Sequence, residues 1–486
     1  MNRPISYLLC LVMLLTLTNC AKNPVSKSSE FVLMSEAQEL ELGQKMAFEV
    51  EKQMPLLPED DPLVRYVDVV GQRLATVSDR QDLYYRFNVV DDGTINAFAL
   101  PGGYIYIHRG LLNHFNSESE LAAVLGHEIG HVTARHSVQR YTQMQTYNIG
   151  MAVASIFVPV PQAAGQLTNL LAQAIVQGYG REAEMEADKL SIRYLQKAGY
   201  DIHATTRILA TLQRLDKISS TEKRDEGEKV ESYHGAFSSH PETKLRIDQA
   251  VATSKSDKGS SGFVGHEPLL KVLDGKPYGD SPDEGAVVGQ HFLHPKLGIQ
   301  LEFPERWSIK NTKSALNARV RKQKIYFQLT STELRKRQSA KEILESMFPE
   351  RRRDPVVQHT RNDFEVAHTI ARISAPHVSK ATVHASVYRK GPRIFMMLMW
   401  SEREHFKENI ADFSAIESSF RPYLADRDGD VPRIYLYSWK KTDTWQGLAA
   451  RSGDLLGRFT ADRFAALNGL NAEESPTPGD LIKLVR

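Results

Sequence analysis

The sequence His127-Glu128-Ile129-Gly130-His131 is the most informative stretch of this chain. Two histidines four residues apart lie on one face of an α-helix, about one turn from each other. Both imidazole rings can therefore reach the same metal ion, and Glu128 is placed to activate the attacking water. Since imidazole nitrogen is a common ligand of Zn²⁺, the pattern predicts a catalytic zinc site with His127 and His131 as ligands.

The residues around this motif predict the helix that carries it. Ser117 is a typical helix N-cap, and Glu120 stands at the third helical position. Apolar residues then recur at helical spacing, at Leu121, Val124, Leu125, Ile129 and Val132. If the helix continued to His136, that ring would be rotated away from the zinc-facing side, so we interpret His136 as structural.

A catalytic zinc site usually has a third protein ligand and one open position for water. The best source is the acidic stretch from Tyr179 to Asp188, in which Glu184 and Asp188 would share one helix face. One of them can bind zinc while the other accepts a hydrogen bond from a ligand histidine, and the spacing alone does not decide which. Glu182 and Glu186 would lie on other faces and are expected to be solvated.

His-Glu-x-x-His followed by Glu-x-x-x-Asp on a later helix resembles the gluzincin family of the CAAX prenyl protease and HtpX. The pattern is similar to the soluble periplasmic branch of that family, which includes the β-barrel-assembly-enhancing protease. The resemblance implies one Zn²⁺ per chain, with Glu184 as the third ligand and Asp188 behind the ligand histidines.

Two further stretches resemble motifs of the same family. One is the edge strand beside the active site, and the family resemblance implies that it holds an extended substrate through Asn96, Ala97, Phe98 and Ala99. The other is Ser239-His240-Pro241 with Arg246, where the resemblance places the histidine near the metal or the substrate carbonyl. His240, aided by Arg246, would stabilise the oxyanion, or it would bind zinc in a latched resting state; the sequence leaves both roles open.

These elements together predict an α+β protein. A mainly helical zincin catalytic domain with a small edge-strand sheet is followed by an α+β accessory domain and a small βααβ LysM-like module. We place the metallopeptidase domain at residues 35–255, a linker or extension at 256–290, the accessory domain at 291–424 and the final module at 431–486.

Several helices have recognisable start signals. Ser35 with Gln38 is a capping-box pattern that predicts a helix through about Gln53, and Pro62 begins a second helix through about Ala75. A further helix is expected over residues 204–215, followed by a polar loop over 219–235. Residues after the linker, up to about 290, are expected to be irregular.

The C-terminal half carries weaker resemblances. Leu301 to Trp307 and Ile416 to Phe420 resemble α+β domains of the PsbP and Mog-like type, and the alternative is an accessory domain without chemistry. The stretches Lys441 to Trp445, Asn468 to Leu470 and Pro478 to Ile482 resemble a LysM-like unit. That resemblance implies possible peptidoglycan binding, with a purely packing role as the alternative.

The N-terminus has the pattern of a secretory signal. Arg3 precedes an apolar run from Ile5 to Leu17, and Leu17-Thr18-Asn19-Cys20 resembles a bacterial lipoprotein signal. Residues 1–20 are therefore expected to be a signal with lipidation at Cys20, residues 21–34 a tether, and the location the periplasm with an anchor in the outer membrane. Ordinary signal cleavage nearby is the alternative. Because Cys10 would be removed with the signal, no internal disulfide is expected.

Composition limits the possible partners. The chain has 486 residues, of which 41% are hydrophobic and 25% charged, and its formal net charge of +2 argues against a nucleic-acid partner. Residues 141–180 contain no charged side chain and are expected to form a lid or helical hairpin over the site, with an interfacial membrane contact as the alternative.

The sequence thus predicts a zinc-dependent endopeptidase of the bacterial cell envelope. Its expected substrates are unfolded or misassembled proteins, in quality control or outer-membrane protein assembly. Two alternatives remain: a cell-wall-binding lipoprotein with a chaperone-like role, and a hydrolase of peptidoglycan peptides.

Overall fold

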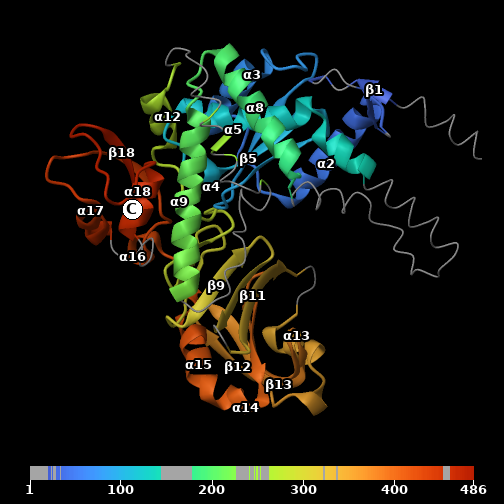
Figure 1. Cartoon of the computed structure of the whole chain (residues 1–486). Helices are drawn as coiled ribbons and strands as arrows, with labels where there is room; N and C mark the ends of the chain where they lie inside the picture. Colours follow the sequence, from blue (N-terminus) through green and yellow to red (C-terminus); the bar gives the residue numbers. More distant parts are fainter. Residues whose placement is uncertain are drawn as a thin grey trace, which may run out of the picture. The chain divides into compact units, whose positions relative to one another are not determined.

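The computed structural model describes residues 20–22, 24–25, 29–32, 34–143, 178–225, 240, 246, 248–249, 252, 262–320, 323–334, 338–452 and 460–486. Helices and several separate sheets make the protein α+β, which confirms the predicted fold class. The chain divides into two compact units (Figure 1). The first comprises Met1–Tyr278 with Arg433–Arg486, and the second comprises Gly279–Pro432.

The first unit is mainly helical, with small sheets. Its N-terminal elements are β1 (Cys20–Lys22), β2 (Ser29–Phe31), α2 (Glu36–Gln53), α3 (Pro62–Ala75), β3 (Arg86–Val90), β4 (Ala97–Leu100), η1 (Pro101–Gly103), β5 (Tyr104–His108) and α4 (Arg109–Leu112). These are followed by α5 (Glu118–Thr133), α8 (Arg181–Ala198), α9 (Ala204–Asp225), α12 (His266–Leu273), β17 (Ile434–Ser438), α17 (Trp445–Ser452), α18 (Thr460–Leu467) and β18 (Leu481–Val485).

Helices α2 and α3 begin where their capping signals predict. The Ser35 side chain accepts a hydrogen bond from the backbone of Gln38, whose own side chain accepts one from the Ser35 backbone. Helix α3 has Pro62 at its first position and Asp61 as its N-cap. Its buried face, which includes Leu63, Val67, Val70 and Leu74, packs into the main core of this unit.

The sheet beside α5 has the strand order β3-β5-β4, with β4 at an edge. Strand β3 is parallel to β5, and β4 is antiparallel to β5 across the short turn η1. Gly102 adopts a φ of 78° in that turn, a conformation that glycine reaches without steric cost. Gly43 of α2 touches the same turn: a Cβ there would lie 1.9 Å from the carbonyl oxygen of Pro101. Helix α2 therefore packs directly on the turn that presents β4.

Helices α5 and α8 pack closely against each other (Figure 1). The Ser117 side chain caps α5 by accepting a hydrogen bond from the Glu120 backbone, as predicted. Gly126 and Gly130 face α8, where an added Cβ would lie 3.1 Å from the Ser191 hydroxyl and 3.1 Å from the Ala187 carbonyl oxygen, respectively. This close approach brings the carboxylates of α8 within reach of the α5 histidines.

Two elements differ from the sequence predictions. Helix α9 continues to Asp225, so residues 219–225 are helical instead of forming part of a loop. Helix α12 lies in the stretch that was expected to be irregular, and its Leu269 and Leu273 are buried in the main core. Helix α12 gains its stability from an apolar face that this core covers, which a short local pattern does not reveal.

The C-terminal residues of the first unit form the predicted βααβ order. Strands β17 and β18 pair antiparallel, and a cluster that includes Trp439, Trp445 and Phe464 fills the space under α17 and α18. Lys483 of β18 is fully buried, and its Nζ donates hydrogen bonds to the carbonyl oxygens of Asn113 (2.7 Å) and Phe115 (2.6 Å). These two carbonyls belong to the loop that leads into α5, so this module packs on the segment that precedes the helix bearing the zinc motif.

The second unit contains two antiparallel sheets. Their order is β12-β13-β14-β15-β11-β10-β9 in the larger sheet and β16-β8-β7-β6 in the smaller one. The strands are β6 (Ala286–Val288), β7 (His291–His294), β8 (Ile299–Glu302), β9 (Trp307–Thr312), β10 (Ala315–Val320), β11 (Ile325–Glu333), β12 (Val357–Arg361), β13 (Phe364–Ala375), β14 (Val378–Lys390), β15 (Arg393–Glu402) and β16 (Arg421–Pro422). The helices are α13 (Ala340–Met347), η2 (Glu350–Arg352), α14 (Arg403–Phe406), η3 (Lys407–Asn409), α15 (Ile410–Ser419) and α16 (Ala425–Asp428). Large aromatic side chains, among them Trp307, Phe327, Phe413 and Phe420, are buried between these elements.

Several predictions fall on residues outside the described ranges. These are residues 1–19 of the predicted signal, residues 144–177 of the uncharged segment, and Ser239 and Pro241 of the late motif. Cys20 is the first residue of β1, and its lipidation stays a prediction. Within the ranges that can be described, none of the helices is long and apolar enough to span a bilayer.

Candidate metal centre

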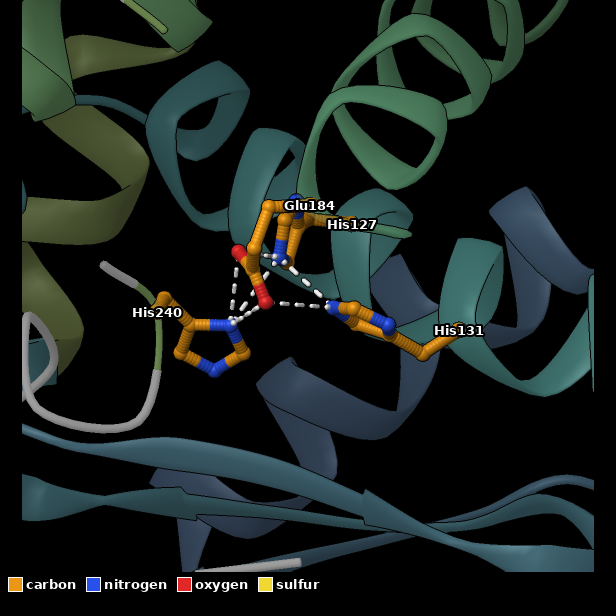
Figure 2. Close-up of side chains that lie close together, drawn as sticks. All are labelled: His127, His131, Glu184 and His240. Atoms are coloured by element: carbon orange, nitrogen blue, oxygen red, sulfur yellow. Dashed lines mark hydrogen bonds and ion pairs between the residues drawn. The ribbon is translucent and has the colours of Figure 1, made fainter. Parts of the chain in front are cut away.

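Four buried side chains converge inside the first unit: His127, His131, Glu184 and His240. One ligand atom from each lies within 4.8 Å of those from the other three. The Nε2 atoms of His127 and His131 are 3.0 Å apart, and the Glu184 carboxylate oxygens lie 3.3 Å from the first and 3.5 Å from the second. Figure 2 shows the three imidazole rings placed around the Glu184 carboxylate. The structure thus brings together the residues that the motif and the later helix were predicted to supply.

Asp188 and Arg246 lie behind this group. The Asp188 carboxylate is 2.9 Å from Nδ1 of His127, and Arg246 donates to both oxygens of Asp188 at 2.7 Å. An ionised carboxylate only accepts hydrogen bonds, so the proton of His127 resides on Nδ1. In the neutral ring, which is the form that binds a metal, the Nε2 lone pair then faces His131 and Glu184.

His136 contacts His131, and Glu186 in turn contacts His136; neither contact was predicted from the sequence. His136 Nδ1 lies 2.8 Å from Nδ1 of His131, and His136 Nε2 lies 3.2 Å from Glu186. The prediction assumed a continuous helix, but α5 ends at Thr133, and Arg135 adopts a φ of 58° that turns the chain back. Glu186, expected to be solvated, is instead half-buried and paired. Sequence spacing contained no signal for either contact.

Glu128 is buried beside the four convergent side chains, and one of its oxygens has no partner. Its Oε1 lies 3.4 Å from Nε2 of His240, whereas Oε2 makes no hydrogen bond with any described residue. Burial raises the pKa of Glu128 above the usual range of a carboxyl group. An unpaired buried carboxylate oxygen is costly unless a substrate or water molecule uses it, as a general base requires.

His240 contacts the acidic group and the edge strand at the same time. Its Nδ1 lies 3.0 and 3.1 Å from the two Glu184 oxygens and 3.2 Å from Nε2 of His127. Its Nε2 lies 3.3 Å from the carbonyl oxygen of Ala97. The neighbouring carbonyl, that of Asn96, accepts a hydrogen bond from His108 of β5. Since successive carbonyls along a strand point to opposite sides, Ala97 presents its carbonyl at the open edge, where His240 covers it.

The other predicted substrate-binding residues line this edge of the sheet. Asn96 directly precedes β4, and Ala97, Phe98 and Ala99 belong to it and are buried. Phe98 stacks on Tyr106 of β5, with ring centroids 5.0 Å apart. The Phe98 side chain therefore supports the strand, and the backbone of β4 is the part available for pairing.

The titratable groups of the centre strongly perturb one another. For His127, burial lowers the pKa, but the hydrogen bonds with Asp188 and Glu184 outweigh it and raise the pKa to about 9. Burial depresses the pKa of His131 well below its ordinary value. Burial alone would raise the pKa of Glu184, but the surrounding histidines, above all the charge of His240, hold it well below the usual range. Glu184 is thus held as an anion among the histidines.

This donor set fits a divalent metal ion. The Nε2 atoms of His127 and His131 face each other 3.0 Å apart with a carboxylate beside them, and imidazole nitrogen with carboxylate oxygen is a zinc ligand set. Their Nδ1 atoms are each engaged by another side chain, which leaves the Nε2 positions for the ion. The unpaired oxygen of Glu128 adds the group that a hydrolytic site needs.

A comparison with known protein families covers the same region. The sequence model of peptidase family M48 matches residues 63–254. The family resemblance carried by the zinc motif is thereby confirmed, and the match supports a metalloprotease.

Curated relatives of the M48 domain are moderately similar. A Vibrio cholerae relative of the beta-barrel assembly-enhancing protease type is 34% identical over 184 residues, which is 36% of this chain and 38% of the relative. Mitochondrial metalloendopeptidase OMA1 of Schizosaccharomyces pombe is 32% identical over 195 residues, which is 40% of this chain and 53% of the relative. The beta-barrel assembly-enhancing protease of Escherichia coli (strain K12) is 30% identical over 197 residues, which is 38% of this chain and 40% of the relative. The chain therefore spans between 38% and 53% of the length of these relatives.

Among solved structures, cyanobacterial PsbP from Synechocystis matches with a TM-score of 0.23 and 13% identity. The match covers 28% of this chain and 95% of that chain. Likeness at this level assigns neither a fold nor a function to any part of the protein.

A small apolar cavity adjoins the candidate centre of the M48 domain. Its volume is about 50 Å³, and His127, Glu128 and His240 form one of its sides. The remaining lining is largely aliphatic and includes Leu111, Val124, Ile208, Leu209 and Leu212. The cavity therefore places an apolar surface directly beside the unpaired carboxylate of Glu128.

Proposed function

We propose that this chain is a zinc-dependent endopeptidase of the bacterial cell envelope that cleaves unfolded or misassembled proteins. The observation that carries the proposal is the convergence of His127, His131 and Glu184 beside Glu128, whose Oε2 has no hydrogen-bond partner among the described residues. The M48 match supports the peptidase class, and the similarity to beta-barrel assembly-enhancing proteases supports a role in envelope protein quality control. Because the chain spans only part of those relatives, their own substrates are not assumed.

His127, His131 and Glu184 would hold the zinc ion. When bound, zinc lowers the pKa of a coordinated water and polarises the scissile carbonyl. Asp188 and Arg246 keep His127 in its metal-binding form. The Asp188 carboxylate fixes the proton on Nδ1 of His127, and the Arg246 guanidinium holds that carboxylate.

Glu128 would act as the general base and then as the general acid. Its unpaired Oε2 accepts a proton from the attacking water and later delivers that proton to the leaving amine. The raised pKa of this buried carboxyl group suits both steps, because a base with a very low pKa would return the proton poorly.

The surroundings of Glu128 favour an extended substrate with aliphatic side chains. The open edge of β4 offers the Ala97 carbonyl for backbone pairing, which recognises an extended chain more than a particular sequence. The adjoining cavity is lined by aliphatic residues such as Leu209. In folded proteins most aliphatic side chains are buried and most extended backbone is already paired. Unfolded polypeptide exposes both, so it is the substrate class that fits this site.

His240 would close this site in the resting protein. It occupies the Ala97 carbonyl that a substrate strand would use, and it contacts both oxygens of the candidate ligand Glu184. A substrate must displace the ring to pair with β4. Of the two roles left open by the sequence, this geometry favours the latch over stabilisation of the oxyanion.

If His240 is a latch, removing its side chain should increase the peptidase activity. Replacing His240→Ala should raise kcat/KM toward an unfolded protein several-fold, because the variant no longer has to expose the edge of β4. The measurement is the rate of cleavage of a fluorescent casein at several substrate concentrations. His203→Ala, an exposed histidine near the start of α9, is the matched control. A fall in kcat for His240→Ala would instead assign the oxyanion role to this ring.

The membrane anchor and the cell-wall contact are also proposals. The signal pattern ending at Cys20 supports attachment to the outer membrane from the periplasm, and labelling with palmitate followed by cell fractionation tests it. The LysM-like pattern of residues 431–486 supports contact with peptidoglycan, which co-sedimentation of the full chain with purified cell wall tests.

One experiment tests the central proposal. The full-length chain should degrade unfolded casein, stop when a zinc chelator is added, and resume when zinc is returned. A natively folded globular protein of similar size should resist cleavage. Activity that persists in excess chelator would contradict the zinc mechanism. Release of fragments only from peptidoglycan peptides would favour the hydrolase alternative, and suppression of aggregation without cleavage would favour the chaperone-like one.

A further inference from the structure

His136 contacts the candidate ligand His131 on the side of the ring away from the other ligands. The two Nδ1 atoms are 2.8 Å apart, and the ring planes are inclined by 68°. On its other side, His136 Nε2 lies 3.2 Å from a carboxylate oxygen of Glu186. Both histidines are buried, so water does not compete for the contact between them, whereas Glu186 is partly exposed.

Only one arrangement of protons in these contacts leaves Nε2 of His131 free to bind a metal. Ionised Glu186 can only accept, so Nε2 of His136 carries a proton. A neutral His136 then has a lone pair on Nδ1 and accepts the proton that His131 carries on its own Nδ1. This leaves Nε2 of His131 unprotonated, on the side facing His127 and Glu184. The opposite arrangement would place a proton on the atom that must bind the metal.

We propose that His136 and Glu186 are positioning residues that fix the tautomer of His131 and thereby keep its Nε2 available to the metal. The pair does for His131 what Asp188 does for His127, with an imidazole inserted between ligand and carboxylate. This inference rests on the proposed metal site but concerns residues outside the zinc motif.

The surrounding structure holds His136 in place. Arg135 adopts its left-handed φ of 58°, which is uncommon for a residue with a side chain. Its guanidinium donates at 2.8 Å to Glu39 of α2, a buried carboxylate that also accepts from Arg80. The contacts with α2 therefore stabilise the turn that brings His136 back to His131.

Tyr179 restrains the ligand ring from a third direction. Its ring stacks on that of His131 with centroids 4.1 Å apart and an interplanar angle of 19°. The Tyr179 hydroxyl is 2.7 Å from that of Ser137, the residue after His136. The ring of His131 is thus held between a stacking partner and a hydrogen-bonding partner.

Zinc affinity of the full-length chain tests the proposal without reference to activity. Competition with a chromophoric chelator should show about 10- to 100-fold weaker zinc binding for His136→Leu. His136→Asn should recover most of that loss, because the asparagine Oδ1 can occupy the place of Nδ1 and accept from His131. The visible spectrum of the Co²⁺-loaded chain should change in His136→Leu and return toward that of the wild type in His136→Asn.

Glu186→Ala should also weaken zinc binding, whereas Glu182→Ala should not. Glu182 is the matched control, since it is an exposed glutamate one turn earlier on the same helix. This pair keeps the test decisive if His136→Leu does not fold. Unchanged zinc affinity in a folded His136→Leu, or an asparagine variant as weak as the leucine variant, would overturn the inference. Failure of the wild-type chain to bind zinc would instead refute the proposed metal site.

Discussion

Glu128→Gln should bind zinc as tightly as the wild type and yet lose nearly all peptidase activity. The amide keeps the size and shape of the side chain but cannot accept the proton of the attacking water. Removing a general base of this kind costs about 10²- to 10⁴-fold in rate. Because Oε2 of Glu128 has no partner among the described side chains, the substitution breaks no existing hydrogen bond through that atom.

The measurement combines kcat/KM on casein with the zinc content of the purified chain. Glu182→Gln, an exposed position on α8, controls for the loss of one negative charge near the site. A Glu128→Gln variant that cleaves at the wild-type rate would remove Glu128 from the mechanism. A variant that loses both zinc and activity would show that this carboxylate supports the metal site instead of acting on water.

The residues that helical spacing places together were predictable from the sequence. His127 and His131 are one turn apart on α5, and Glu184 and Asp188 are one turn apart on α8. The periodicity of a helix fixes such pairs regardless of tertiary context, and capping residues fix where the helix begins. The family resemblance supplied the choice between Glu184 and Asp188, which spacing alone left open.

The contacts that depend on a chain reversal were not predictable. His136 reaches His131 only because α5 ends at Thr133 and Arg135 turns the chain, and that turn is held by Glu39, far away in sequence. Strands such as those of the second unit are harder to predict from the sequence for a related reason. The fit of a strand depends on neighbours supplied by distant segments, so its own residues give a weak signal.

Lys483 is another residue whose role only the tertiary structure reveals. It belongs to the predicted LysM-like module, where a lysine on a strand would ordinarily face solvent. Instead it is fully buried and donates to the carbonyl oxygens of Asn113 and Phe115, in the loop before α5. Ala466 of α18 is likewise part of the main core of the first unit. The module therefore stabilises the segment from which the catalytic helix begins.

Lys483→Met should accordingly destabilise the first unit by about 2–6 kcal/mol, since each of the two buried carbonyls left unpaired costs about 1–3 kcal/mol. Methionine fills much of the same volume, so the loss reflects the hydrogen bonds more than a cavity. Thermal and urea unfolding of the full chain measure the effect. Lys271→Met is the control, because Lys271 is an exposed lysine paired only with Glu267 one turn away on α12.

The difference in the free energy of unfolding between wild type and Lys483→Met should depend on pH, and this dependence distinguishes a buried lysine from an exposed one. Burial lowers the pKa of Lys483 from 10.5 to about 7, although the nearby charge of Glu120 opposes the shift. Between these values the unfolded chain binds a proton that the folded chain does not, so folding becomes more favourable as the pH rises. The neutral amine still has two N–H groups, which match the two carbonyl acceptors. Below about pH 7 both states are protonated and the dependence ends.

The stability gap between wild type and Lys483→Met should therefore widen from about pH 7 to about pH 10, by at most about 1.4 kcal/mol for each pH unit. The charges of Glu120 and His114 interact with the amine in the wild type, so the loss of these interactions is part of the measured difference. A gap that stays constant would mean that Lys483 remains charged when buried. A gap of zero at every pH would mean that the C-terminal module does not support the catalytic helix, and would restore the view of an independent cell-wall-binding module.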